Sequence, residues 1–192
     1  MITVLPNIIL AGPNKSCIHR FGVEVGVGHN HFLKSAPCSI ETFGDFVVDR
    51  NDIYITPTIR MTYRLNLSNK FHMQSFMGYN RLGGKGSSDK YSFDALELGI
   101  FIQYRYSNLS FGIGAEINRN LCVRYHRSSY HANRSDWFVK YSKDVGARVS
   151  YSITNMSLNL ESWFGMNDLT DGPVHSATVY ENHYRIMIGY NF

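Results

Sequence analysis

The stretch LELGIFIQYRYSNLSFGIGAEIN, residues 96–118, decides the fold. On both sides of the dipeptide Ser107-Asn108, apolar side chains occupy every second position, as far as Leu96 in one direction and Ile117 in the other. Period-two alternation indicates a strand with one apolar and one polar face, and a two-residue gap between two such runs predicts a hairpin. The stretch therefore predicts two long antiparallel strands joined by a tight turn.

The same alternation recurs along the chain and predicts eight strands. They cover about residues 21–28, 53–65, 71–80, 96–106, 109–118, 137–151, 156–167 and 184–192. Tight connections at 66–70, 107–108 and 154–155 alternate with long ones at 34–52, 82–92, 119–136 and 168–182. This spacing predicts an all-β, eight-stranded, antiparallel up-and-down transmembrane barrel with short periplasmic turns and long extracellular loops. Pro57 lacks the N–H that a sheet requires, and we expect a bulge there.

Composition favours one membrane-embedded domain. No run approaches the roughly 18 apolar residues of a spanning helix, but alternation hides the hydrophobicity of barrel strands from such a search. The net charge of +4 is mild and scattered, which argues against nucleic acid as a partner. We expect residues 20–192 to form a monomeric barrel in the outer membrane of a Gram-negative bacterium, and residues 1–19 to be an arm or part of a signal segment.

The polar faces of the predicted strands carry charges that suit a narrow lumen better than a water-exposed surface. A soluble barrel of the lipocalin kind also alternates, so the position of these charges is decisive. Isolated buried charges are costly, and we expect these acids and bases to pair across the interior. The predicted network comprises Glu24, Arg60, Arg64, Glu97, Arg105, Glu116, Arg148, Glu161 and Arg185.

The last strand carries a pattern that resembles the C-terminal signal read by the barrel-assembly machinery. Its residues are Tyr184, Ile186, Ile188, Tyr190 and Phe192. Together with the opening FGVEVGV at residues 21–27, the chain resembles the small outer-membrane β-barrel family of the size of OmpX and the OmpA transmembrane domain, over about residues 20–192. Members of that family include anchors, adhesins and enzymes, so the resemblance implies a fold and leaves the activity open.

One motif suggests catalysis. His126 and Ser128 form a His-x-Ser on the predicted outer rim, which resembles the lipid A deacylases of the PagL type. There the histidine would act as base and the serine as nucleophile, with Asp136 or Asp144 as the orienting carboxylate. Ser129 stands where that family usually has asparagine, and short motifs recur by accident. A lipid A-modifying hydrolase is therefore the alternative to a non-enzymatic structural or surface-interaction protein, and a small-solute channel is the third hypothesis.

Binding residues outside that motif point to anions rather than metals. His29-x-His31 provides only two ligands, so we expect neither a metal nor a cofactor. Outer-membrane lipid, lipopolysaccharide and the assembly machinery are the expected partners. The arginines of the 119–136 segment could pair with the acidic residues of the 34–52 and 168–182 segments, or could instead bind lipopolysaccharide phosphates or an acidic extracellular partner. They are Arg119, Arg124, Arg127 and Arg134.

Overall fold

The structure, a computed structural model, is a closed barrel of antiparallel strands, and it describes residues 19–34, 54–85, 89–127, 130–133, 138–169 and 179–192. Neighbouring strands pair in the order β4-β3-β2-β1-β9-β8-β7-β5, and β4 also pairs with β5, which closes the ring. The predicted eight-stranded all-antiparallel barrel is confirmed. The strands are β1 (His19–Lys34), β2 (Ile55–Asn66), β3 (Phe71–Lys85), β4 (Asp89–Tyr106), β5 (Leu109–Arg127), β7 (Tyr141–Ile153), β8 (Met156–Gly165) and β9 (Val179–Asn191).

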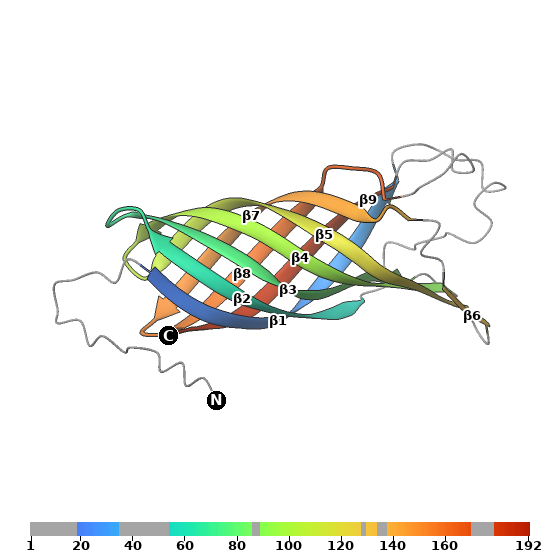
Figure 1. The fold of residues 1–192 in the computed structure, drawn as a ribbon, viewed down its shortest axis with the longest axis horizontal. Coiled ribbons are helices and arrows are strands. Elements are labelled where there is room, and N and C mark those ends of the chain that lie inside the picture. The colour runs from blue at the N-terminus through green and yellow to red at the C-terminus, as the bar shows by residue number, and fades with distance from the viewer. Residues whose placement is uncertain (1–18, 35–53, 86–88, 128–129, 134–137, 170–178) are drawn as a thin grey trace, which may run out of the picture.

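A ninth, four-residue strand, β6 (Tyr130–Asn133), pairs only with the far end of β5 and extends the wall beyond the barrel (Figure 1). The short turns at 67–70, 107–108 and 154–155 lie at the opposite end, which we call the turn end. β1 begins and β9 ends at the turn end (Figure 1). The described part of the chain contains no helix long and apolar enough to cross a membrane.

Two predicted loops are largely strand, so those boundaries are wrong. Residues 82–85 and 89–92 continue the β3–β4 ladder, in which Leu82 pairs with Phe93. Residues 119–127 continue β5, and 130–133 form β6. The β3–β4 and β4–β5 pairs continue the ladder past the point where period-two alternation of apolar side chains stops, because backbone hydrogen bonding does not require an apolar face.

The expected bulge at Pro57 is also wrong. The β1–β2 register runs without a shift through Val27 and Pro57. The β2–β3 pairing begins only at Thr58, so on that side β2 has no partner at Pro57 within the described ladder. A proline is tolerated at such an edge because no ladder bond is lost. The barrel has its register shift instead at residue 121 of β5, where Ala95 pairs with Asn120 but Asp94 pairs with Cys122.

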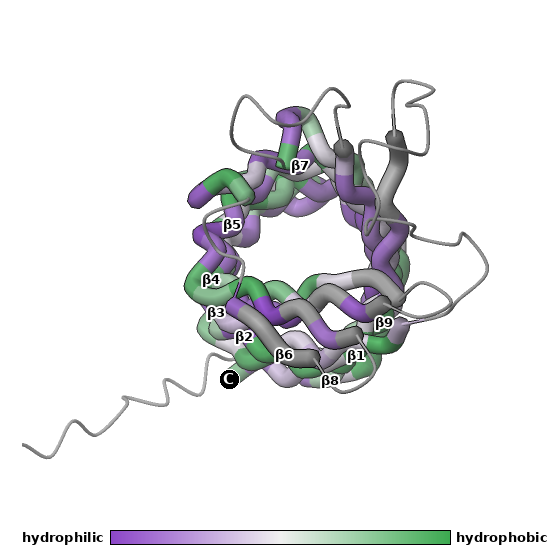
Figure 2. The backbone as a smooth tube through the Cα atoms, turned by 90° about the vertical axis from the view of Figure 1, so that its right-hand side faces the viewer, coloured by the Kyte–Doolittle hydropathy of each residue, from purple (hydrophilic) through white to green (hydrophobic). Residues whose placement is uncertain are grey.

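Alternation places apolar side chains outside and polar ones inside. Ile59 is 52% exposed, for example, whereas Arg60 is 1% exposed. The colours of successive residues alternate around the ring in Figure 2. On β5, outward positions from Leu109 to Ile117 carry no charge, and the first outward charge is Arg119. Ten tilted residues rise by about 25 Å, the height of the apolar band of an outer-membrane barrel.

Two groups of apolar side chains interrupt the polar lumen. Phe76, Phe101 and Trp163 meet at mid-height, with ring centroids 5.0 to 6.1 Å apart. A second group, which we call the apolar cap, lies at the loop end. It comprises Leu82, Phe93, Val123, Phe138 and Leu169, each at most 5% exposed. Phe93 is its hub: it pairs with Leu82 and Val123 in register, and its ring contacts that of Phe138 at 4.8 Å.

Candidate functional site

The centre of the lumen is a four-membered ionic cluster. The Arg60 Nε donates to Glu24 Oε2 at 2.7 Å, and the Arg60 guanidinium also binds Glu161. Arg148 binds the other oxygen of Glu24 and lies 3.5 Å from Glu161. These groups come from β1, β2, β7 and β8, and all four are at most 4% exposed. The cluster therefore ties together strands that are far apart in the sequence, and each buried charge has an opposite partner.

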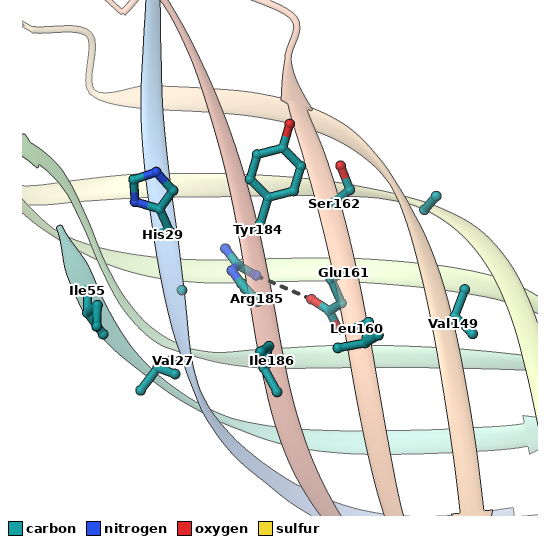
Figure 3. Close-up of a pocket in the computed structure, with 12 residues that line it drawn as sticks. Val27, His29, Ile55, Val149, Leu160, Glu161, Ser162, Tyr184, Arg185 and Ile186 are labelled. Atoms are coloured by element: carbon teal, nitrogen blue, oxygen red, sulfur yellow. Dashed lines mark ion pairs between the residues drawn. The ribbon is translucent and has the colours of Figure 1, made fainter. Parts of the chain in front are cut away.

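Toward the loop end, Arg185 of β9 gathers three carboxylates. Its Nη1 and Nη2 donate to the two oxygens of Glu116 at 3.0 Å each, a bidentate geometry. Glu97 lies 3.0 Å away and Glu161 3.8 Å away. Figure 3 shows Arg185 and Glu161 joined between β9 and β8, while their neighbours Ile186 and Leu160 belong to the apolar outer wall. His183 adds its Nε2 at 3.2 Å from Glu116.

Aromatic rings pack against the same guanidinium groups. Arg60 lies 4.3 Å from the ring centroid of Phe76, Arg148 5.2 Å from that of Phe101, and Arg185 5.7 Å from that of Trp163. Guanidinium groups stack well on aromatic faces, which fixes their orientation in the absence of water. These rings were not predicted to lie in the lumen, although their parity on β3, β4 and β8 matches that of the lumen residues.

Seven of the nine residues predicted for the lumen network lie together in these two ionic clusters. The other two do not reach a carboxylate. Arg64 donates to the side-chain oxygen of Gln74 at 3.2 Å, and among the described residues no ion pair includes Arg105. The sequence analysis also missed three charged groups with lumen parity, Arg20, Asp144 and Glu181. Alternation was the signal that would have found them, since each lies an even number of residues from a predicted member.

The proposed hydrolase residues are only partly described. His126 lies near the end of β5, opposite Lys90 on one side and His131 on the other. Ser128 and Asp136 lie outside the described residues. Asp144 pairs in register with Glu116, ten residues before His126 on β5, which is about 33 Å of extended chain. Asp144 is also buried in the lumen, where it accepts a hydrogen bond from Asn118 at 2.9 Å. It is therefore too far away to orient His126.

The outer surface carries a band of cationic side chains just above the apolar wall at the loop end, which we call the basic belt. Arg119 pairs with Tyr141, and Ile117 pairs with Lys143, so these basic groups lie side by side on β5 and β7. Asp94 of β4 is the acid within the belt, 2.8 Å from Arg81 and 2.6 Å from Arg124. The belt comprises Arg81, Arg119, Arg124, Lys140 and Lys143.

The remaining candidates lie apart from the belt. His29 and His31 project from the same face of β1, and no group of three or more His, Cys, Asp or Glu side chains among the described residues is arranged to hold a metal ion. The thiol of Cys122 on β5 is free. The five residues of the predicted assembly signal lie on the outer face of β9 or directly after it.

A closed antiparallel barrel pairs the backbone polar groups of its strands with one another, and closed barrels and helices are the structures that span membranes. The described strands form such a ring, with a charge-free apolar wall and a packed ionic interior. Such barrels are the integral proteins of the Gram-negative outer membrane. The chain is therefore an outer-membrane β-barrel, as the sequence predicts.

Solved structures of small outer-membrane proteins share this fold. Ail, the attachment invasion locus protein of Yersinia pestis, is 14% identical and covers 90% of this chain and 98% of its own, with a TM-score of 0.54. Neisserial surface protein A is also 14% identical and covers 90% of this chain and 97% of its own, with a TM-score of 0.55. Ail in complex with the heparin analogue sucrose octasulfate gives 12% identity, 91% and 99% coverage and a TM-score of 0.50. No family model and no curated sequence matches the chain.

Proposed function

We propose that the protein is a non-enzymatic surface barrel whose basic belt binds lipopolysaccharide phosphates and whose long loops meet an extracellular partner. The belt is the observation that carries this proposal. Arg119 and Lys143 face outward, toward neighbouring lipid, and Lys140 is exposed beside them. Arg119 lies about 25 Å above the turn-end limit of the apolar wall. Anionic headgroups lie at that level in the outer leaflet.

The chemistry of the belt fits phosphate. Arginine presents a planar fork to phosphate oxygens, and lysine acts as a compact positive charge. Asp94 is held between Arg81 and Arg124, which leaves Arg119, Lys140 and Lys143 as the part of the belt without a described carboxylate partner. An apolar wall directly below the belt would receive the acyl chains of the same lipid molecule. The exposed wall residues Ile113 and Val145 belong to the same two strands.

The lumen favours a structural role over a channel. The two ionic clusters cross the interior at mid-height, and the apolar cap fills the described part of the loop end. A barrel of this strand number has an interior filled by side chains. Conduction would require both layers to open, so we propose that the barrel serves as a rigid support for its outer surface.

The loops add a second proposed contact, with an acidic extracellular ligand. The name of Ail refers to attachment and invasion, and that protein has been crystallised with a sulfated heparin analogue. Cationic groups at the loop end of the present chain suit the same type of anion. We also propose that the outer face of β9 is the signal for the assembly machinery, since β9 joins the first strand, β1, to the rest of the barrel.

Lipopolysaccharide titration of the purified barrel in detergent tests the belt. We expect the triple variant Arg119→Gln, Lys140→Gln and Lys143→Gln to bind lipopolysaccharide on the order of 100-fold more weakly, because each basic residue near an anionic surface contributes about 1 kcal/mol. Lys70→Gln is the matched control, since Lys70 is exposed at the turn end. An unchanged affinity in the triple variant would refute the proposal. Titration of the parent, the triple variant and Lys70→Gln with heparin measures binding of an acidic loop ligand separately from binding of lipopolysaccharide.

A further inference from the structure

The lumen charges are balanced in number but separated along the barrel axis. Among the lumen-facing side chains that the structure describes, there are six arginines and six carboxylates. The carboxylates lie at mid-height or toward the loop end, together with Arg60, Arg148 and Arg185. They are Glu24, Glu97, Glu116, Asp144, Glu161 and Glu181. The other three arginines lie at the turn end without an acid. We call this group of Arg20, Arg64 and Arg105 the basic mouth.

The basic mouth places like charges on neighbouring strands at one end of the lumen. Arg20 and Arg64 are direct cross-strand partners on β1 and β2, with both side chains on the lumen face. Like charges in directly opposite positions destabilise a sheet. Arg64 also experiences the positive charges of Arg105 and Arg148, and Arg105 that of Arg20. The folded barrel therefore concentrates three guanidinium groups from three strands around one end of its interior.

Unused hydrogen-bond donors point into this end. Arg64 is only 6% exposed, and its Nε has no hydrogen-bond partner. His72, at 1% exposed, faces the charges of Arg64 and Arg105, and neither of its ring nitrogens has a hydrogen bond of regular geometry. A buried donor without a partner costs about 1–3 kcal/mol, and more if it is charged. These donors lie where a bound anion would accept from them.

Among the described residues, no Asp or Glu side chain forms an ion pair with Arg20, Arg64 or Arg105. Glu24, the carboxylate that interacts with Arg64, already accepts hydrogen bonds from Arg60, Arg148, Gln74 and Asn159. The turns at 67–70, 107–108 and 154–155 contain no Asp or Glu, and neither does the sequence of residues 1–18. These three guanidinium groups therefore have no side-chain carboxylate to neutralise them, and an anion from solution would do so.

We propose that the basic mouth is a binding site for a small oxyanion of the phosphate class, either the free ion or a phosphate ester. Arg20 and Arg105 are partly exposed and form the entrance, while Arg64 and His72 form the buried floor. Guanidinium groups bind tetrahedral oxyanions through paired N–H donors, and a dianion neutralises more of the surplus charge than a carboxylate does. The site opens at the turn end of the barrel, where Arg20 and Arg105 are partly exposed, and is independent of the basic belt.

Calorimetric titration of the purified barrel in lipid-free dodecyl maltoside tests this site. We expect inorganic phosphate to bind at one saturable site and to raise the melting temperature above that in chloride of equal ionic strength, because a ligand of the folded state stabilises it. Glycerol phosphate is the second probe. Binding of both anions identifies a site that recognises the phosphoryl group, and binding of phosphate alone identifies a site for the free ion.

Three single variants link the binding to the basic mouth. Arg64→Gln and Arg105→Gln should each weaken phosphate binding at least about tenfold, whereas Lys70→Gln, which removes a positive charge from an exposed turn at the same end, should leave it unchanged. Arg64→Gln should melt no lower than the parent in chloride, because it removes repulsion with Arg20. Equal melting temperatures of the parent in phosphate and chloride, or parent-like binding by both mouth variants, would overturn the proposal.

Discussion

Glu24→Gln is the change that tests the ionic interior most directly. Glu24 is 3% exposed and accepts from Arg60 at 2.7 Å, from Gln74 at 2.9 Å, from Asn159 at 3.3 Å and from Arg148. Glutamine has nearly the same shape but no charge, so Arg60 and Arg148 would share Glu161 alone. Removing one partner of a buried pair costs about 3–5 kcal/mol, and we expect a loss of unfolding free energy in that range.

Urea unfolding in lipid vesicles, followed by tryptophan fluorescence and by heat-modifiable migration on gels, measures this loss. Glu181→Gln is the matched control, because Glu181 is equally buried but belongs to no ion pair among the described residues. It should change the unfolding free energy by less than about 1 kcal/mol, since most substitutions that break no pair are mild. The double variant Glu24→Gln with Arg148→Gln should lose less than the sum of the two single changes. Equal losses for Glu24→Gln and Glu181→Gln would refute the reasoning.

Three further substitutions test the packing of the lumen wall, the apolar cap and the candidate hydrolase motif. Gly146→Ala should destabilise the barrel by about 1–3 kcal/mol in the same unfolding assay, because the new methyl carbon would lie 2.4 Å from the Trp163 ring; parent-like stability would contradict this. Phe93→Ala should cost about 3–5 kcal/mol and speed proteolysis at the loop end, since Phe93 is the hub of the apolar cap. Ser128→Ala should leave lipid A acylation unchanged by mass spectrometry, whereas a loss of deacylation would establish the hydrolase instead.

The sequence predicts the barrel well because alternation encodes which face of a strand meets lipid. The number of strands, their direction and the charged parity of the lumen all follow from that rule. The alternation rule does not show which lumen charges pair with each other. Arg148 binds Glu24 across 124 positions of sequence, a contact set by register and by closure of the barrel. For the same reason, the sequence analysis could not foresee that Arg64 and Arg105 would lie at an end without acids.

Aromatic residues explain most of the other misses. Phe76, Phe101 and Trp163 occupy lumen positions, where a rule that places polar residues inside ignores them. The structure shows that these rings hold the guanidinium groups by stacking. The Pro57 prediction failed because sequence alone does not show at which residue the pairing of two neighbouring strands stops; β3 itself continues to Lys85.

The single extra residue in β5 has a consequence for how the protein can vary. Before residue 121 the even-numbered side chains of β5 point into the lumen, as Glu116 and Asn118 do. After residue 121 the buried side chain is the odd-numbered Val123. The one inserted residue therefore reverses which positions of β5, even or odd, face the lumen. Beyond residue 121, a substitution at an odd-numbered position of β5 therefore meets the packed interior and one at an even-numbered position meets solvent, the reverse of the rule nearer the turn end.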